Sequence, residues 1–228
     1  MFEHLLPFVR DTQLPVTVYV ATSQIETGQA YWFDRVMNAL QGAGETRIDM
    51  RAAGLGQWVV GPMRGKARWS QIGDILAALK AAPAADRDRL ADEIIAQTPA
   101  IGSDFTPLTP MSIAQLQELA ADPLVTIGAH SHCHNLLDQI PLEEARASIA
   151  KSRKLLEGWI GQPVAHFAYP NGNYTPELMD AIRDLGFSSA TSLDERLATQ
   201  DAPKMALPRI SVGRYDVLSR FLLRLTNV

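Results

Sequence analysis

Apolar residues recur along the chain with two spacings, one typical of helices and one typical of strands. The clearest helix is predicted over residues 142–160, where apolar side chains return every three or four positions and Gly161 follows. Short apolar runs predict four strands, at residues 14–21, 124–128, 164–169 and 187–191. Because strands and helices alternate, the order predicts a parallel sheet or barrel wrapped by helices.

Hydroxyl–proline pairs mark two further helix starts. Thr109-Pro110 and Thr175-Pro176 each combine an N-cap hydroxyl with a proline suited to the first turn. Amphipathic spacing predicts the other helices, over residues 2–10, about 30–40, two segments within 72–97, and a terminal helix over 215–225.

Composition is that of an ordinary globular protein. We expect one domain over residues 1–228, with a helical insertion at about residues 42–108, since 46% of the 228 residues are hydrophobic. A net charge of −4 gives no basic footprint for nucleic acid, and no apolar run approaches the ~20 residues of a membrane-spanning helix. Residues 1–10 lack the pattern of a signal peptide, so a cytoplasmic location is expected for the sequence as written.

A histidine motif directly follows the second predicted strand. His130 and His134 lie four residues apart, and imidazoles at that spacing can face one way on a helical turn and hold one metal ion. Zinc is the expected ion, because it accepts nitrogen ligands and catalytic zinc sites leave one position for water. The alternative is a polar loop whose imidazoles only bond to backbone carbonyls. Cys133, the single cysteine, is expected to be a small buried residue.

A turn ends the third predicted strand at residues 167–172, with the sequence Phe-Ala-Tyr-Pro-Asn-Gly. Exposed N–H groups of such a turn could face a developing oxyanion. Tyr169 could stack against a sugar, although a tyrosine that closes a strand more often packs with its hydroxyl satisfied. An ordinary strand-to-helix turn is the alternative for the whole segment.

Three segments together resemble the polysaccharide deacetylase family, zinc-dependent enzymes that remove acetyl groups from carbohydrates. They are residues 127–134, residues 152–157 with 161–163, and residues 167–172 with 185–187. The resemblance implies an α/β fold, an incomplete and distorted (β/α) barrel. It also implies Zn²⁺ or another divalent metal on His130 and His134, and a backbone N–H near Asn171 for the oxyanion. The implied substrate is an acetylated glycan or polysaccharide, with Tyr169 as a substrate contact.

The sequence departs from the family pattern at the catalytic carboxylates. Family members open with a strand that ends in Thr-Phe-Asp-Asp-Gly, which supplies the base and the third zinc ligand, whereas no Asp-Asp pair occurs here. Ala168 replaces the family's arginine that orients the base, and no histidine follows His166 as a general acid. The resemblance therefore implies that the first strand is missing. The strand next to the missing one would then be an open edge, through which two copies could associate.

Three functions stay open at this point. The chain could be a deacetylase, a non-catalytic carbohydrate-binding relative or inactive fragment, or a zinc hydrolase of another kind. The last function needs a carboxylate from elsewhere in the chain, and the candidates are Asp11, Asp34, Asp138 and Asp194. Arg209 could pair with a site carboxylate or form a structural ion pair.

Overall fold

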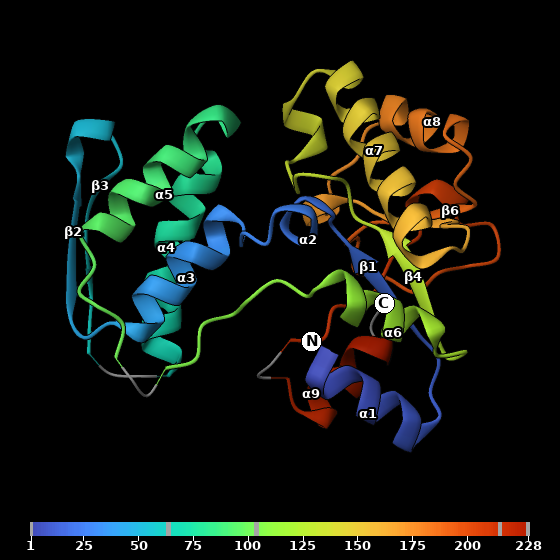
Figure 1. Cartoon of the computed structure of the whole chain (residues 1–228), viewed down its shortest axis with the longest axis horizontal. Helices are drawn as coiled ribbons and strands as arrows, with labels where there is room; N and C mark the ends of the chain where they lie inside the picture. Colours follow the sequence, from blue (N-terminus) through green and yellow to red (C-terminus); the bar gives the residue numbers. More distant parts are fainter. Residues whose placement is uncertain (1, 63–64, 103–104, 214–215, 227–228) are drawn as a thin grey trace. The chain divides into compact units, whose positions relative to one another are not determined.

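The computed structural model describes residues 2–62, 65–102, 105–213 and 216–226, which form two compact units (Figure 1). The first unit joins Met1–Thr27 to Met111–Val228, and the second is Gly28–Pro110. Each unit has a hydrophobic core of its own. In the described part of the chain, no helix is long and apolar enough to cross a membrane.

A four-stranded sheet organises the first unit, in the order β1-β4-β5-β6. Its strands are β1 (Val16–Val20), β4 (Val125–Ala129), β5 (His166–Ala168) and β6 (Ser189–Thr191). Each neighbouring pair is parallel, and Leu207 adds a parallel bridge to Thr191. The four predicted strands and the parallel sheet are confirmed, and β1 stands at one end of the order.

The helices that flank this sheet in the sequence are predicted apart from α2, and α6 starts later than expected. They are α1 (Phe2–Thr12), α2 (Ser23–Thr27), α6 (Ile113–Ala121), α7 (Leu142–Ile160), α8 (Pro176–Asp184) and α9 (Leu218–Thr226), with 3-10 turns at Leu137–Gln139, Pro170–Gly172 and Lys204–Ala206. The Thr175 hydroxyl caps α8 as expected. Helix α6 begins after Ser112 rather than at Thr109, because Ser112 and Gln115 form a capping box. The predicted start of the last helix, Tyr215, lies outside the described residues.

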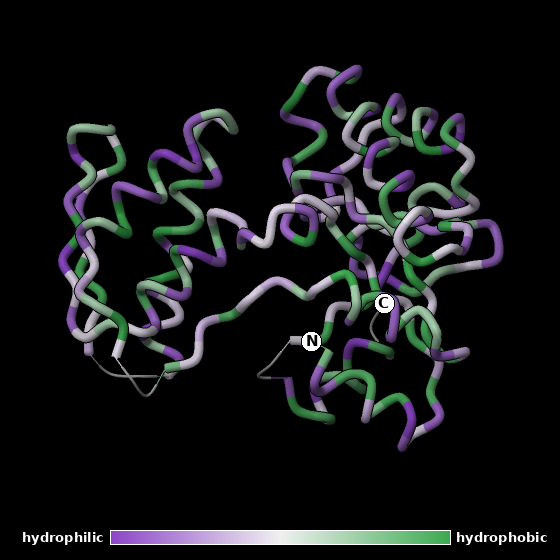
Figure 2. The backbone as a smooth tube through the Cα atoms, in the orientation of Figure 1, coloured by the Kyte–Doolittle hydropathy of each residue, from purple (hydrophilic) through white to green (hydrophobic). Residues whose placement is uncertain are grey.

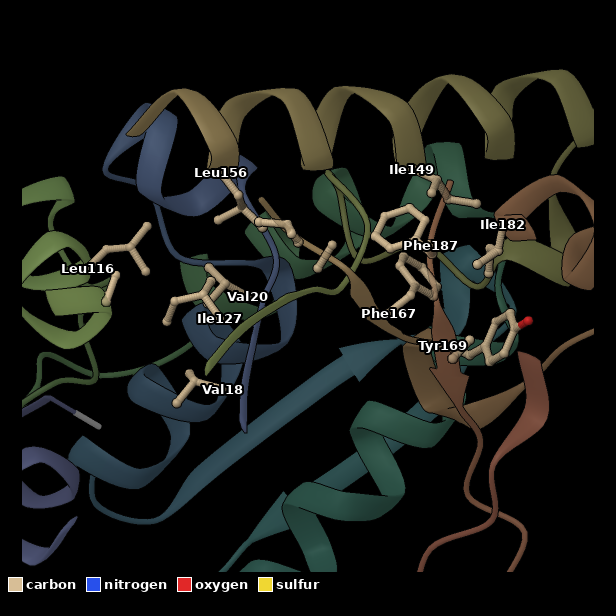
Figure 3. Close-up of a cluster of buried hydrophobic side chains, with 14 of the residues drawn as sticks. Val18, Val20, Leu116, Ile127, Ile149, Leu156, Phe167, Tyr169, Ile182 and Phe187 are labelled. Atoms are coloured by element: carbon tan, nitrogen blue, oxygen red, sulfur yellow. The ribbon is translucent and has the colours of Figure 1, made fainter. Parts of the chain in front are cut away.

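The core of the first unit holds the strands and α7 together. Val20 of β1 and Ile127 of β4 are buried with Leu156 of α7 (Figure 3). The rings of Phe167 and Phe187 meet edge to face, with centroids 5.5 Å apart. This packing fixes the positions at which the four parallel strands end.

The second unit differs from the predicted helical insertion. It contains α3 (Trp32–Gly42), α4 (Lys66–Ala81) and α5 (Arg87–Ala96), with 3-10 turns at Arg51–Ala53 and Ala84–Asp86 and an antiparallel pair of strands, β2 (Thr46–Met50) and β3 (Gly56–Val60). Figure 2 shows apolar and polar positions interleaved along these elements. The strands form because Thr46, Ile48 and Met50 are buried while the residues between them are exposed, and because Gly54 adopts a left-handed turn. The unit also begins at Gly28, before the predicted boundary.

Candidate active site

The candidate site lies where the parallel strands of the first unit end. β4 ends at Ala129, β5 at Ala168 and β6 at Thr191, so the residues that follow them meet at one edge of the sheet. The N–H of His130 donates to the carbonyl oxygen of Val20 at 3.0 Å, which continues the β1–β4 pairing by one residue. Such edges are where α/β proteins place their chemistry.

The structure brings the two predicted metal ligands together. The rings of His130 and His134 lie edge to face with centroids 4.7 Å apart. Nδ1 of His130 lies 2.7 Å from the carbonyl oxygen of Ala168. A carbonyl can only accept, so Nδ1 carries the proton and Nε2 keeps its lone pair. Burial lowers the pKa of His130, the bond to Ala168 opposes that shift, and the positive charge of Arg209 adds to it.

A left-handed loop, rather than the predicted helical turn, places these rings side by side. Ser131 has φ 61° and His134 has φ 57°, which are uncommon values for residues with side chains. The buried Ser131 hydroxyl accepts the N–H of His134 at 3.1 Å and so closes the loop. Cys133, expected to be buried, is exposed here, because the loop turns away from the core.

His132, between the two candidate ligands, tethers this loop to two helices. Its Nδ1 lies 2.9 Å from the hydroxyl of Thr22, and its Nε2 lies 2.8 Å from Nζ of Lys151 on α7. Lys151 also bonds to Glu26 of α2 at 3.0 Å. Lysine can only donate, so Nε2 accepts and Nδ1 donates to the buried Thr22 hydroxyl. The Ser148 hydroxyl accepts the backbone N–H of His132 at 3.1 Å. No local sequence pattern indicates these tethers, because the residues that form them are far apart in the chain.

The segment at residues 167–172 ends in a tight turn, as predicted. Asn171 is exposed with φ 58°, and its amide donates to Asn173 at 2.7 Å. Gly172 has φ 78°, and a Cβ there would lie 2.5 Å from the Cβ of Leu193. The oxyanion role of the Asn171 backbone N–H stays a prediction.

Tyr169 does not fit the predicted sugar contact. Its side chain is 1% exposed, and its hydroxyl donates to the carbonyl oxygen of Met205 at 2.8 Å. Residues two apart on a strand share a face, and the rings of Phe167 and Tyr169 lie 5.5 Å apart within the core (Figure 3). Tyr169 is therefore a core residue whose polar tip is satisfied, which corrects the prediction.

The described residues do not complete a metal site from side chains. Among them, no group of three or more His, Cys, Asp or Glu residues is placed to hold an ion. Asp138 accepts from Asn173 at 2.9 Å, and Asp194 accepts from Tyr174 and Ser192, each at 2.9 Å. Of the other two candidates, Asp11 is exposed on α1 and Asp34 belongs to the second unit. His130 and His134 thus fit two ligand positions, and Zn²⁺ stays a prediction.

Comparison with known proteins finds similarity to one family over part of the chain. Residues 95–190 match the family model of the polysaccharide deacetylases, a range that contains both histidines and the turn at Asn171. Over this segment the chain is similar to the polysaccharide deacetylases. The Bacillus subtilis protein YxkH, named as a polysaccharide deacetylase, is 26% identical over 99 residues, which is 43% of this chain and 35% of YxkH. The chain therefore spans about a third of that relative's length.

The fold is similar to that of a solved deacetylase domain. The match with the BpsB deacetylase domain from Bordetella bronchiseptica spans 92% of this chain and 65% of the BpsB chain. The identity is 14% and the TM-score is 0.51. The match with IcaB from Ammonifex degensii spans 46% of this chain and 50% of the IcaB chain, with 26% identity and a TM-score of 0.40. The similarity to BpsB supports a polysaccharide deacetylase type of α/β fold. It leaves open whether the barrel is complete.

Proposed function

We propose that the chain acts as part of a metal-dependent deacetylase that hydrolyses the amide C–N bond of acetylated sugars in a glycan. One observation carries this proposal: the paired imidazoles of His130 and His134 at the end of β4, with Nδ1 of His130 committed to Ala168. A histidine whose other ring nitrogen donates to a backbone carbonyl is the usual form of a metal-ligating imidazole. The match to the deacetylase model over residues 95–190 supports the same chemistry.

His130 would hold the ion through Nε2, since its Nδ1 is bonded to Ala168, and His134 would hold it through one ring nitrogen. A bound divalent ion such as Zn²⁺ would polarise the acetyl carbonyl and lower the pKa of its bound water towards ~7. The bond from Ser131 to His134 keeps the loop in the shape that pairs the two rings. The tethers from His132 to Thr22 and Lys151 hold the same loop against α2 and α7.

The turn after β5 would bind the oxygen on which negative charge develops. The left-handed conformation of Asn171 turns the backbone sharply at the end of β5, and a backbone N–H in such a turn can stabilise an oxyanion. Gly172 packs against Leu193 and so fixes the position of this turn. The proposal assigns no general base to this chain.

The zinc content of the purified chain after dialysis tests the proposal. We expect one zinc per chain in the wild type and in His4→Ala, which removes an exposed imidazole on α1, and none in His134→Ala. Acetate release from N-acetylglucosamine oligomers should then require zinc. A wild-type chain that holds no zinc would contradict the metal dependence. Zinc and glycan binding without acetate release would instead identify a non-catalytic carbohydrate-binding relative.

A further inference from the structure

Arg209 lies at the same sheet edge, with its guanidinium partly buried and only partly bonded. Its Nε donates to the carbonyl oxygen of Ser192 at 2.8 Å, and its guanidinium lies 5.9 Å from the centre of the Tyr19 ring. Burial lowers the pKa of Arg209, as expected for a cation taken partly out of water. These contacts use one of its five N–H donors.

Within the described residues, Arg209 has no carboxylate partner. Asp194 contacts the backbone of Arg209, whose N–H donates to the Asp194 carbonyl oxygen at 3.1 Å. The Asp194 carboxylate, however, bonds to the hydroxyls of Tyr174 and Ser192. The charged fork of Arg209 is therefore left with donors that no described side chain accepts.

In the described part of the chain, the buried Arg68 and Arg87 and the half-buried Arg153 have their donors paired with a carboxylate or with several carbonyl oxygens. Arg153 also lies over an aromatic ring, 5.1 Å from the centre of Phe187, but its Nε bonds to the Glu157 carboxylate at 2.8 Å. Arg68 and Arg87, in the second unit, donate to several backbone carbonyl oxygens. A half-buried guanidinium without an anion is costly, so the exception at Arg209 points to a ligand.

We propose that Arg209 binds a carboxylate group at the edge of the sheet beside His130, either free acetate or the carboxylate of an acidic sugar. Its contacts place it there, because Ser192 directly follows the last residue of β6 and Tyr19 of β1 pairs with Gly128, two residues before His130. The planar fork of arginine matches a carboxylate through two parallel N–H bonds. The Tyr19 ring and the Ser192 carbonyl hold the fork in place.

The inference rests on the proposed function, because acetate is the expected product of deacetylation and an acidic sugar would be part of the glycan. Arg209 would then slow or speed product release, or select glycans that carry uronic acids. Neither role requires a metal ion or hydrolysis, so carboxylate binding can be measured when both are absent.

Titration of the metal-free 228-residue chain with sodium acetate and with sodium glucuronate, followed by NMR at constant ionic strength, tests the inference. Acetate binding identifies the product and glucuronate binding an acidic sugar. We expect Arg209→Gln to weaken the affinity for the carboxylate by at least about tenfold. Arg153→Gln is the matched control and should bind like the wild type. Arg209→Lys keeps the charge and loses the planar fork, so its carboxylate affinity should lie between those of the wild type and Arg209→Gln. It replaces Arg209→Gln as the test variant if that protein does not fold.

Three outcomes would overturn the inference. The wild type could bind neither carboxylate, which is expected if Asp194 turns to pair with Arg209 in solution. Arg209→Gln could bind as well as the wild type. His134→Ala could lose carboxylate binding, and the carboxylate site would then belong to the histidine pair. A chain that binds acetate through Arg209 but neither holds zinc nor releases acetate from glycans would contradict the proposed function and leave the carboxylate site intact.

Discussion

His130 donates from Nδ1 to the carbonyl oxygen of Ala168 across a distance of 2.7 Å, so the first residue after β4 is held by the last residue of β5. This bond sets the tautomer of His130 and aims Nε2 away from the sheet edge that Ala168 occupies. The orientation of a candidate metal ligand thus depends on strand pairing between β4 and β5 rather than on the histidine loop alone.

Zinc should stabilise the wild-type chain and not the His130→Ala variant. A ligand that binds only the folded state adds about 2.7 kcal/mol to the free energy of unfolding at a concentration one hundred times its Kd. Melting temperatures with and without zinc measure this for each protein, so any instability of the variant itself cancels. EDTA should reverse the shift. An equal shift in both proteins would place the bound zinc elsewhere.

Replacing Thr22 by Val should loosen the histidine loop with little change in side-chain volume. The variant leaves the Nδ1 proton of His132 without the buried hydroxyl that accepts it, which costs about 1–3 kcal/mol. We expect a lower melting temperature and, if the metal proposal holds, weaker zinc binding. Thr12→Val on α1 is the control, because its hydroxyl is exposed and bonds only within its own helix. Matching effects in the two variants would show that the tether to His132 has no role.

Local sequence signals determined the frame of the first unit. α7 has the predicted bounds because its apolar period is regular and Gly161, with φ 67°, ends it. α8 begins after Thr175 because a hydroxyl and a proline suit one helix start. The prediction of a helical insertion does not include β2, although Thr46–Met50 alternates buried and exposed positions. Ser112 and Gln115 have the spacing of a capping box in the sequence, whereas the predicted helix starts at Thr109.

The candidate site was only partly predictable, because its contacts are long-range. The pairing of His130 with His134 followed from their spacing and from the strand before them. The bonds from His132 to Thr22 and Lys151 join residues 110 and 19 positions apart, respectively. No local pattern encodes such contacts. Tyr169 was ambiguous for the same reason, since only the folded chain shows the Met205 carbonyl that accepts its hydroxyl.

Gly172→Ala should destabilise the chain by more than about 2 kcal/mol. The new methyl group would meet the backbone N of Leu193 at 2.6 Å, and φ 78° is unfavourable for alanine. Gly158→Ala on α7 is the matched control, because the added Cβ meets open space there and alanine favours a helix by about 0.5–1 kcal/mol. The urea concentration at the midpoint of unfolding should therefore fall for Gly172→Ala and rise for Gly158→Ala. A stable Gly172→Ala protein would mean that the turn beside Asn171 can relax.

Glu157→Gln should destabilise the chain at neutral pH and have little effect in acid. Burial pushes the pKa of Glu157 up, but bonds from the Val164 N–H and from Arg153 outweigh it and hold the pKa below its ordinary value of 4.5. A carboxyl whose pKa is lowered by folding stabilises the folded state above the unfolded pKa, and this stabilisation disappears as the pH falls through the folded pKa. The bonds measure 3.0 Å and 2.8 Å and are partly exposed, so we expect a loss of roughly 1 kcal/mol at pH 7 after solvent screening. Unfolding free energies from pH 7 to pH 3 should converge for the two proteins below about pH 4.5, whereas the exposed Glu118→Gln on α6 should track the wild type throughout. A difference that persists at pH 3 would assign the effect to altered packing and not to the charge of Glu157.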